Sequence, residues 1–349
     1  MGWEKGDKKG QPIGHPGSVF VRWAGRGLHL TLKIFSDSLK NAQVRRLTKR
    51  GVMRTSGVVG FILLACLAML PLQAAAAADN QVLYEGDSIY HHITIRQDGG
   101  KRCMIFGRQR DLRQTCIELA KPDASVFEYT AMMFAGFLFR PDAGKVCLIG
   151  LGGGYVPTVF RMHLPKVRLE TVEVDPLVEK LAREHFSFTV PSGHALAIDD
   201  GRQFLKKNRD RYDQIWLDAF NSDYVPAHMT TREFLQLAKS RLNEGGIVIQ
   251  NLFCDNRLYD AQIATFRAVF AKVFVFEGQR SKSCVIVASD RPACTPAELR
   301  KQARKHGGKI GRIDLGAESG KCGVAPVPRN APILTDDFNP ANLLLMQKK

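Results

Sequence analysis

A glycine-rich turn between two apolar runs constrains the fold of this chain more than any other feature. Residues 146–149 (VCLI) are a short apolar run typical of a buried parallel strand. Four glycines follow within five positions: Gly150, Gly152, Gly153 and Gly154. Residues 158–164 predict a helix, and residues 167–174 predict a second strand that ends in Glu173-Val174-Asp175. This order of elements predicts a βαβ unit.

The acidic residues at the end of the second strand indicate what the unit binds. A nucleotide-binding βαβ unit needs a carboxylate about twenty positions beyond its glycine turn, because that carboxylate accepts hydrogen bonds from ribose hydroxyls. Glu173 and Asp175 both lie near that offset. The glycines allow positive φ and let a ligand approach the bare backbone. The alternative is a tight turn that holds no ligand, but the agreement of every offset favours a nucleotide or nucleoside.

The rest of the chain alternates between strand and helix patterns. Further strands are expected at 195–198, 214–217, 247–252, 273–277 and 284–288, and helices at 176–185, 202–208, 230–242 and 258–270. Alternation of this kind predicts a mainly parallel, doubly wound α/β sheet of the Rossmann-like type. We expect five regions: a basic leader (1–56), an apolar signal peptide or membrane anchor (57–78), a small antiparallel β unit (79–125), the nucleoside-binding domain (126–294) and an irregular C-terminal extension (295–349).

The net charge of +16 does not by itself indicate a nucleic-acid partner. Residues 1–56 hold twelve Lys and Arg against three Asp and Glu, so the leader supplies most of the excess. No recognition-helix or zinc-finger pattern is present, and we predict no nucleic-acid binding. The basic leader and the apolar residues 57–78 have the layout of an export signal. Export would place the chain on the periplasmic side, whether the segment is cleaved or stays as an inner-membrane anchor. A leader without function would leave the chain cytoplasmic, and a buried helix is the plainest alternative for residues 57–78.

The eight cysteines show no CxxC pair and no Cys/His cluster at metal spacing, so we predict no metal site. Cys103 with Cys116, and Cys294 with Cys322, are two pairs that an exported chain would allow to form disulfides. The alternative is that all the cysteines are ordinary buried thiols. The sequence leaves these two interpretations open.

Polar groups gather where the expected parallel strands end. In an open α/β sheet, ligands bind at the carboxyl ends of the strands. Four such ends carry polar groups here: the glycine turn, Glu173 with Asp175, Asp199-Asp200-Gly201, and Asp218. These groups match the parts of an S-adenosyl nucleoside. The glycine turn would pass its amino-acid or aminopropyl portion, Glu173 would hold the ribose, Asp200 would accept from the adenine amino group, and Asp218 would face the reacting centre.

Several strings along the chain carry a specific resemblance to a known family. They are EYTAMM, VCLIGLGGG, VEVDP, DDGRQFL, YDQIWLDAF, TTREFLQLAKSRLNEGGIVIQN and LTDDFNP. Residues from about 83 to 290 resemble the spermidine synthase (polyamine aminopropyltransferase) family, as a divergent member. The resemblance implies an S-adenosylmethionine-dependent methyltransferase fold behind a small β unit. It also implies transfer of an aminopropyl group from decarboxylated S-adenosylmethionine to an amine such as putrescine, and a homodimer.

The resemblance assigns roles to individual residues. Glu173 would hold the ribose, and Asp200 with Gly201 the adenine. Asp218 would be the base that takes the proton of the attacking amine, Tyr129 would orient that amine, and Gln250 would line its site. The chemistry agrees, because an amine with a pKa near 10 is protonated at pH 7 and a carboxylate can bind it and then accept its proton.

The chain departs from the family pattern at the amine end. Gly153 stands where the family usually has an aspartate that pairs with the aminopropyl nitrogen, and Ala131 replaces a glutamate. The second carboxylate of the family's signature after Asp218 is either replaced by Asn221 or displaced to Asp223, which we assign to the amine site. We therefore weigh three hypotheses: an aminopropyltransferase, an S-adenosylmethionine-dependent methyltransferase, and an exported binding protein without catalytic activity.

Overall fold

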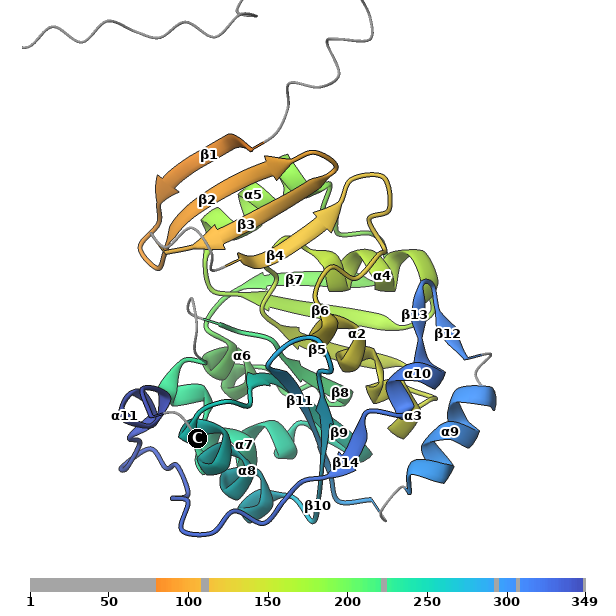
Figure 1. Ribbon diagram of the computed structural model, residues 1–349, viewed down its shortest axis with the longest axis vertical. Coiled ribbons are helices and arrows are strands. Elements are labelled where there is room, and N and C mark those ends of the chain that lie inside the picture. The colour runs from red at the N-terminus through yellow and green to blue at the C-terminus, as the bar shows by residue number, and fades with distance from the viewer. Residues whose placement is uncertain (1–79, 108–112, 221–224, 292–294, 306–307, 348–349) are drawn as a thin grey trace, which may run out of the picture. The chain divides into compact units, whose positions relative to one another are not determined.

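The computed structural model of this protein describes residues 80–107, 113–220, 225–291, 295–305 and 308–347 (Figure 1). The expected leader and the apolar residues 57–78 lie outside this part of the chain, as does Asp223. None of the helices in the described residues is long and apolar enough to cross a membrane.

The first described strands form a small antiparallel sheet in the order β1–β2–β3–β4. Its strands are β1 (Gln81–Asp87), β2 (His92–Asp98), β3 (Lys101–Phe106) and β4 (Arg113–Glu118). Alternating residues such as Ile93 and Ile95 are fully buried, because successive side chains of a strand point to opposite faces. They pack with Leu181 and Phe186 of helix α5 (Pro176–Phe186), which holds this sheet on the larger domain. The small antiparallel sheet expected ahead of the main domain is therefore present.

The main sheet has eight strands in the order β14–β10–β11–β9–β8–β5–β6–β7. Five neighbouring strands are parallel: β5 (Lys145–Ile149), β6 (Arg168–Glu173), β7 (His194–Ile198), β8 (Tyr212–Leu217) and β9 (Leu242–Phe253). Three more extend the β9 edge by antiparallel pairing: β10 (Lys272–Glu277), β11 (Ser283–Ser289) and β14 (Cys322–Val324). The mainly parallel, Rossmann-like sheet predicted from the alternation is confirmed.

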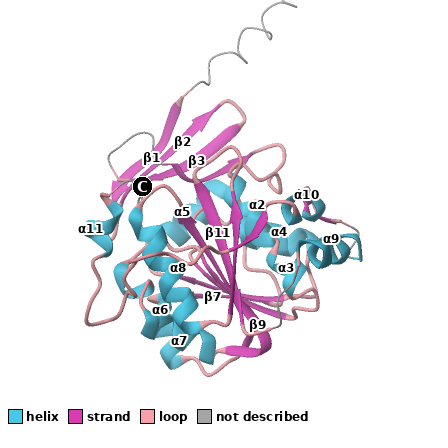
Figure 2. Cartoon of the chain, turned by 60° about the horizontal axis from the view of Figure 1, so that its bottom comes forward, coloured by secondary structure: helices cyan, strands magenta, loops and turns pink. Residues whose placement is uncertain are grey.

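Helices cover both faces of this sheet (Figure 2). One apolar cluster joins the sheet to α2 (Glu128–Phe134), α3 (Gly136–Phe139) and α4 (Tyr155–His163). Another joins the opposite face to α6 (Gly201–Lys207), α7 (Arg232–Ser240) and α8 (Arg257–Val269). The fully buried Trp216 packs its ring against Phe134 and Phe160 at 4.9 and 5.5 Å. Apolar packing thus supports the sheet on both faces and positions the strand ends that carry the polar groups.

The C-terminal residues are more regular than expected. They include α9 (Pro296–Lys305), β12 (Lys309–Ile310), β13 (Ile313–Asp314), α10 (Leu315–Ser319) and α11 (Ala341–Leu345) as well as β14. Between β8 and α7 the short 3-10 helix η1 (Ala227–Met229) precedes Thr231, whose hydroxyl caps α7 by accepting from the Phe234 amide at 3.2 Å.

Candidate active site

A cavity of about 280 Å³ opens where β5, β6, β7 and β8 end. It collects most of the residues predicted from the sequence: Gly150, Gly152, Glu173, Asp200, Gly201, Asp218 and Tyr129. This is the carboxyl edge of the parallel strands, where open α/β sheets bind their ligands. Among the described residues that line the cavity, Glu173, Asp199, Asp200 and Asp218 are acidic and none is Lys or Arg.

The glycine turn lies close enough to β8 to require glycine. Gly150 has φ +106°, and a Cβ there would lie 2.4 Å from the Asp218 carbonyl oxygen. Gly152 has φ +54° and faces the cavity. Gly154 is also left-handed, at φ +76°, but it begins α4 and does not line the cavity. Gly154, which was predicted to bind the nucleoside, therefore contributes to the conformation of the turn and is not a cavity-lining residue.

Glu173 is buried and fastens the glycine turn. Its carboxylate accepts from the amide of Leu151 at 2.9 Å and from the amide of Asp175 at 3.0 Å. Burial raises the pKa of this carboxyl. Each carboxylate oxygen can accept more than one hydrogen bond, so Glu173 keeps acceptor capacity toward the cavity that it lines.

Asp175, the other acidic residue predicted to bind the nucleoside, has a different place. It is fully buried and caps α5, accepting from the Leu177 amide at 2.9 Å. Its second oxygen lies 2.5 Å from the Ser88 hydroxyl and 3.4 Å from Nδ1 of His91. Asp175 does not line the cavity but anchors the connection between β1 and β2 over it.

That connection supplies two lining residues that sequence reasoning missed. Tyr90 and His91 both line the cavity, and the His91 ring stacks on Phe106 at 4.3 Å. The neighbouring His92 points away and contacts Asp87 at 2.7 Å. The alternation of the two histidines was visible in the sequence, but their distance from the glycine turn was not.

Asp200 begins α6 and faces a histidine across the cavity. Its Oδ1 accepts from the Gln203 amide at 2.9 Å, and its Oδ2 lies 2.8 Å from Nε2 of His228. The hydrogen bond with His228 lowers the pKa of Asp200. A Cβ on Gly201 would lie 2.4 Å from Ile149, so the start of α6 packs directly on β5. His228 and its neighbours in η1 form a wall that the sequence did not indicate.

Asp218 follows β8 and is only partly exposed. Its Oδ1 accepts from Nδ2 of Asn251 at 3.1 Å, and it also forms a hydrogen bond with Tyr129. Burial raises the pKa of Asp218 to about 7, although these two hydrogen bonds oppose the rise. Burial and the nearby Asp218 charge raise the pKa of Tyr129 well above 10, which keeps its hydroxyl protonated. Asp218 is thus a carboxyl that both holds and releases a proton near neutral pH.

Gln250, predicted to line the amine site, is not among the cavity residues. Its side chain is buried, and neither atom of its amide has a hydrogen-bond partner in the described part of the protein. Adjacent residues of a strand point to opposite faces, and on β9 it is Asn251 that reaches Asp218. The side-chain amide beside Asp218 is therefore that of Asn251 and not that of Gln250.

Gly153, where the resemblance leads us to expect an aspartate, has little space for a side chain. A Cβ at this position would lie 2.8 Å from the Phe186 ring and 3.0 Å from the Thr115 methyl group. Phe186 belongs to the core beneath the small sheet, and Thr115 belongs to β4. Apolar atoms of this chain therefore occupy the space that the Cβ of any side chain at position 153 would need.

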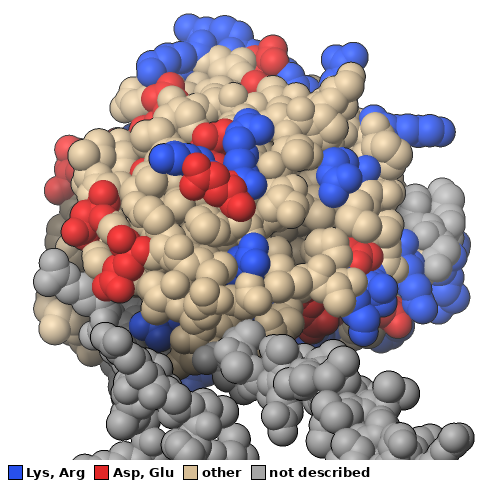
Figure 3. All heavy atoms as spheres, turned by 90° about the horizontal axis from the view of Figure 1, so that it is seen from above, with Lys and Arg blue, Asp and Glu red and all other residues tan. Residues whose placement is uncertain are grey.

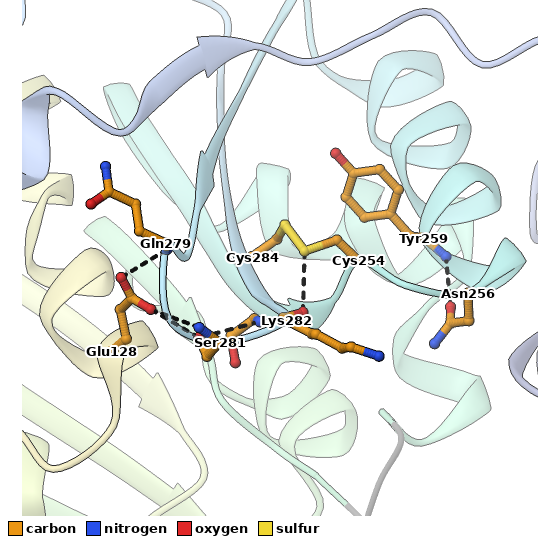
Figure 4. The surroundings of a disulfide bond; sticks show 9 residues. Glu128, Cys254, Asn256, Tyr259, Gln279, Ser281, Lys282 and Cys284 are labelled. Atoms are coloured by element: carbon orange, nitrogen blue, oxygen red, sulfur yellow. Dashed lines mark hydrogen bonds between the residues drawn. A yellow bond between two sulfur atoms is a disulfide. The ribbon is translucent and has the colours of Figure 1, made fainter. Parts of the chain in front are cut away.

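Two disulfides occur in the described residues. Cys103–Cys116 joins β3 to β4, one of the pairings that the sequence allowed. Cys254–Cys284, which was not anticipated, joins the residue after β9 to β11 (Figure 4). It could not be anticipated because it depends on the antiparallel pairing of β11 with β9. No cluster of metal-ligating side chains is found in the described residues.

Glu128, next to Tyr129, forms hydrogen bonds with the turn between β10 and β11. Its carboxylate accepts from the amides of Gln279 at 2.9 Å and Ser281 at 3.1 Å (Figure 4). Burial raises its pKa, but hydrogen bonds from backbone amides and an ion pair with Lys321 lower it to about 2. This carboxylate thus stays charged and fixes the start of α2, from which Tyr129 reaches Asp218.

The fold and cavity define a Rossmann-like α/β protein with an acidic site at the carboxyl edge of its sheet. The Spermine/spermidine synthase domain matches residues 127–287. A polyamine aminopropyltransferase of Vibrio vulnificus is 32% identical over 292 residues, which are 81% of this chain and 98% of the relative. The chain belongs to the spermidine synthase (polyamine aminopropyltransferase) family.

Two further comparisons set this membership in context. A probable spermidine synthase structure from Corynebacterium glutamicum has a TM-score of 0.58 at 18% identity and covers 74% of this chain and 98% of its own, which shows the shared fold. A mouse (Mus musculus) eEF1A lysine and N-terminal methyltransferase is 32% identical over 139 residues, 37% of this chain and 20% of the relative. The likeness to the methyltransferase is confined to a shorter region.

Proposed function

We propose that this protein transfers the aminopropyl group of decarboxylated S-adenosylmethionine to an amine. The observation that carries the proposal is the charge of the cavity, which four carboxylates line without any Lys or Arg among the described residues. Decarboxylated S-adenosylmethionine carries a sulfonium and an ammonium but no carboxylate. Among the described lining residues, the carboxylate of intact S-adenosylmethionine would meet acidic neighbours and no Lys or Arg, which disfavours the methyl donor.

Asp218 is the group best suited to the chemical step. The amine nitrogen attacks the carbon next to the sulfonium, a C–N bond forms, and the C–S bond breaks with its electrons on sulfur. The leaving group is neutral 5′-methylthioadenosine. Ionised Asp218 binds the incoming ammonium and then accepts its proton, and a pKa of about 7 suits both steps near neutral pH. Tyr129, protonated and hydrogen-bonded to Asp218, orients the carboxylate.

The nucleoside half of the cavity supports the remaining assignments. Glu173 offers its acceptor capacity to the ribose, beside the glycine turn that it fastens. Asp200 stands at the start of α6 as an acceptor for the adenine amino group. The acceptor substrate is an amine whose nitrogen reaches Asp218, and a diamine such as putrescine meets that requirement.

The test is calorimetric binding of decarboxylated and intact S-adenosylmethionine, followed by transfer to a panel of amines. We expect tighter binding of the decarboxylated form and formation of 5′-methylthioadenosine only when an amine is present. Asp218→Asn is expected to retain donor binding while losing most of the transfer. Preference for the intact donor would favour the methyltransferase, and binding of neither would favour the binding protein without activity.

We also propose that the folded domain lies outside the cytoplasm. Residues 57–78 have the pattern of an export signal, and the two disulfides are of a kind that persists in oxidising compartments. Fractionation of cells that produce the full chain, with alkylation of free thiols before lysis, tests the proposal. A cytoplasmic chain with all four of these cysteines alkylated would overturn it.

A further inference from the structure

A C-terminal segment that does not line the cavity is bonded to one of the cavity's walls. We call residues 334–340 (LTDDFNP) the C-terminal strap. It is fastened to α8 and α7 at its start, where the Leu334 amide donates to the Thr265 hydroxyl at 2.9 Å and the Leu334 carbonyl accepts from the Arg232 amide at 2.8 Å. The Leu334 side chain is fully buried. The strap therefore has a fixed starting point on the main domain.

Asp336 ties the strap to α6 and to the wall of the cavity. Its carboxylate accepts two hydrogen bonds from the Arg202 guanidinium, one of them at 2.7 Å. The same guanidinium donates to the carbonyl of His228 at 2.9 Å. The backbone amide of Asp336 donates to Glu233 at 2.9 Å. A bidentate Arg–carboxylate pair fixes geometry as well as distance, so Asp336 holds Arg202 in the orientation that reaches His228.

Asn339 ties the strap to the other end of the same wall. Its amide nitrogen donates to the Ala227 carbonyl at 2.7 Å and lies 3.1 Å from the Thr230 hydroxyl. Its amide oxygen accepts from the Ala341 amide at 3.1 Å, which begins α11. One side chain thus connects η1 with the last helix of the described chain.

The wall that receives these bonds is short and belongs to the cavity. Pro226, His228 and Met229 line the cavity, and η1 itself has only three residues. The His228 side chain is about half exposed and has its polar contact with Asp200 at 2.8 Å. A turn of this length has little internal stabilisation, so bonds from outside it decide where His228 stands.

We propose that Asp336 and Asn339 are positioning residues for the nucleoside half of the active site. They hold η1 so that His228 fixes the Asp200 carboxylate in the orientation that receives the base. Neither residue lines the cavity, so both act through His228. The inference rests on the proposed function only for the identity of the ligand, a 5′-thioadenosine nucleoside.

The test is calorimetric binding of 5′-methylthioadenosine, the nucleoside product of the proposed reaction, to the full chain and its variants. We expect Asn339→Ala and Asp336→Asn each to weaken binding about tenfold, because each removes hydrogen bonds that set the position of η1. Asp337→Asn is the matched control. Asp337 is the neighbouring carboxylate, is exposed, and forms no hydrogen bond or ion pair with the described residues, so its variant is expected to bind within twofold of the unmodified protein.

Steady-state kinetics distinguish positioning from general damage. In the Asp336 and Asn339 variants the KM for the donor should rise while kcat and the KM for the amine change less than twofold, and Asp336→Glu should recover part of the donor affinity. If Asn339→Ala does not fold, Asp336→Asn tests the same proposal, because Asp336 is exposed and its replacement leaves the core unchanged.

The two proposals fail in different ways. Unchanged nucleoside binding and donor KM in both variants, in a protein that transfers aminopropyl groups, would overturn the positioning role alone. Strap-dependent nucleoside binding in a protein that transfers nothing would overturn the proposed function alone. A protein that binds no 5′-methylthioadenosine would overturn both.

Discussion

Replacing Asn251 by leucine should move the pH at which the enzyme becomes active. Asn251 donates to Asp218 at 3.1 Å, and this hydrogen bond is one of two that oppose the burial-driven rise of the Asp218 pKa to about 7. A hydrogen bond to a charged group contributes about 1.5–3 kcal/mol. Since one pKa unit corresponds to about 1.4 kcal/mol, loss of the bond should raise the pKa of Asp218 by about one to two units.

The sign of the effect follows from the role of Asp218 as a base. Transfer needs Asp218 in its ionised form. When the pKa is about 7, about half of the Asp218 side chains are ionised at pH 7. In Asn251→Leu that fraction falls to about one tenth or one hundredth. We therefore expect kcat/KM for the amine at pH 7 to fall about 5- to 50-fold and to recover largely by pH 9. Taking the ratio of variant to unmodified enzyme at each pH cancels the ionisation of the amine substrate itself.

Gln250→Leu is the matched control for this experiment. It removes the same amide from the neighbouring position of β9, but Gln250 does not line the cavity and its amide has no partner in the described residues. Its pH profile should coincide with that of the unmodified enzyme. A ratio for Asn251→Leu that stays constant from pH 6 to pH 9 would refute the reasoning, because Asn251 would then act without changing the protonation of Asp218.

Three further predictions concern stability. Gly153→Asp should lower the free energy of unfolding in urea by about 1–3 kcal/mol without improving donor affinity, because its Cβ would overlap the Phe186 ring; a stable variant with tighter donor binding would contradict this. Cys284→Ser opens the Cys254–Cys284 loop of 30 residues and should cost about 3–4 kcal/mol in the same assay, and an unchanged unfolding midpoint would count against it. The raised pKa of Asp218 means that the folded state binds its proton more tightly than the unfolded state, so stability is lost as pH rises from about 4 to 7. Between pH 5.5 and 8.5 the unmodified protein should lose up to about 2 kcal/mol relative to Asp218→Asn, and parallel stability profiles would show the pKa to be ordinary.

The parts of the site that the sequence predicted are those governed by a repeating rule. Glu173, Asp200 and Asp218 each follow an apolar run, and the parallel connection of those runs brings their ends to one edge. The glycine turn was also predicted from the sequence. The structure explains one of its glycines, because Gly150 has no space for a side chain beside β8. Local pattern and topology suffice for these positions because neither depends on a partner far along the chain.

Some positions differed from expectation. They depend either on which of two neighbouring residues faces the site or on contacts between segments far apart in the sequence. Asp175 lies only two residues beyond Glu173, yet it caps a helix and holds Ser88. Gln250 and Asn251 are neighbours whose side chains point to opposite faces, so a shift of one position exchanges their roles. The contact of the C-terminal strap with η1 joins segments about 110 residues apart, and no local pattern encodes it. The roles predicted for residues 57–78 and for Asp223 concern parts of the chain outside the described residues.

The charge of the molecule as a whole and the charge of its cavity have opposite signs, and the cavity matters for the reaction. The sequence carries a net charge of +16, and acidic and basic side chains are interspersed on the face shown in Figure 3. Charges farther than about 8 Å across solvent are largely screened at physiological salt, whereas the four carboxylates line the cavity in which the cation would bind. Arrival of a cationic donor and an ammonium favours the ionised form of Asp218, because opposite charges nearby lower a carboxyl pKa. Asp218 then accepts the proton of the ammonium, and its burial favours the resulting neutral form; the freed amine attacks, and transfer removes the sulfonium charge. The neutral nucleoside is left in a cavity suited to cations, so the same electrostatics that gather the substrates also favour release of the nucleoside product.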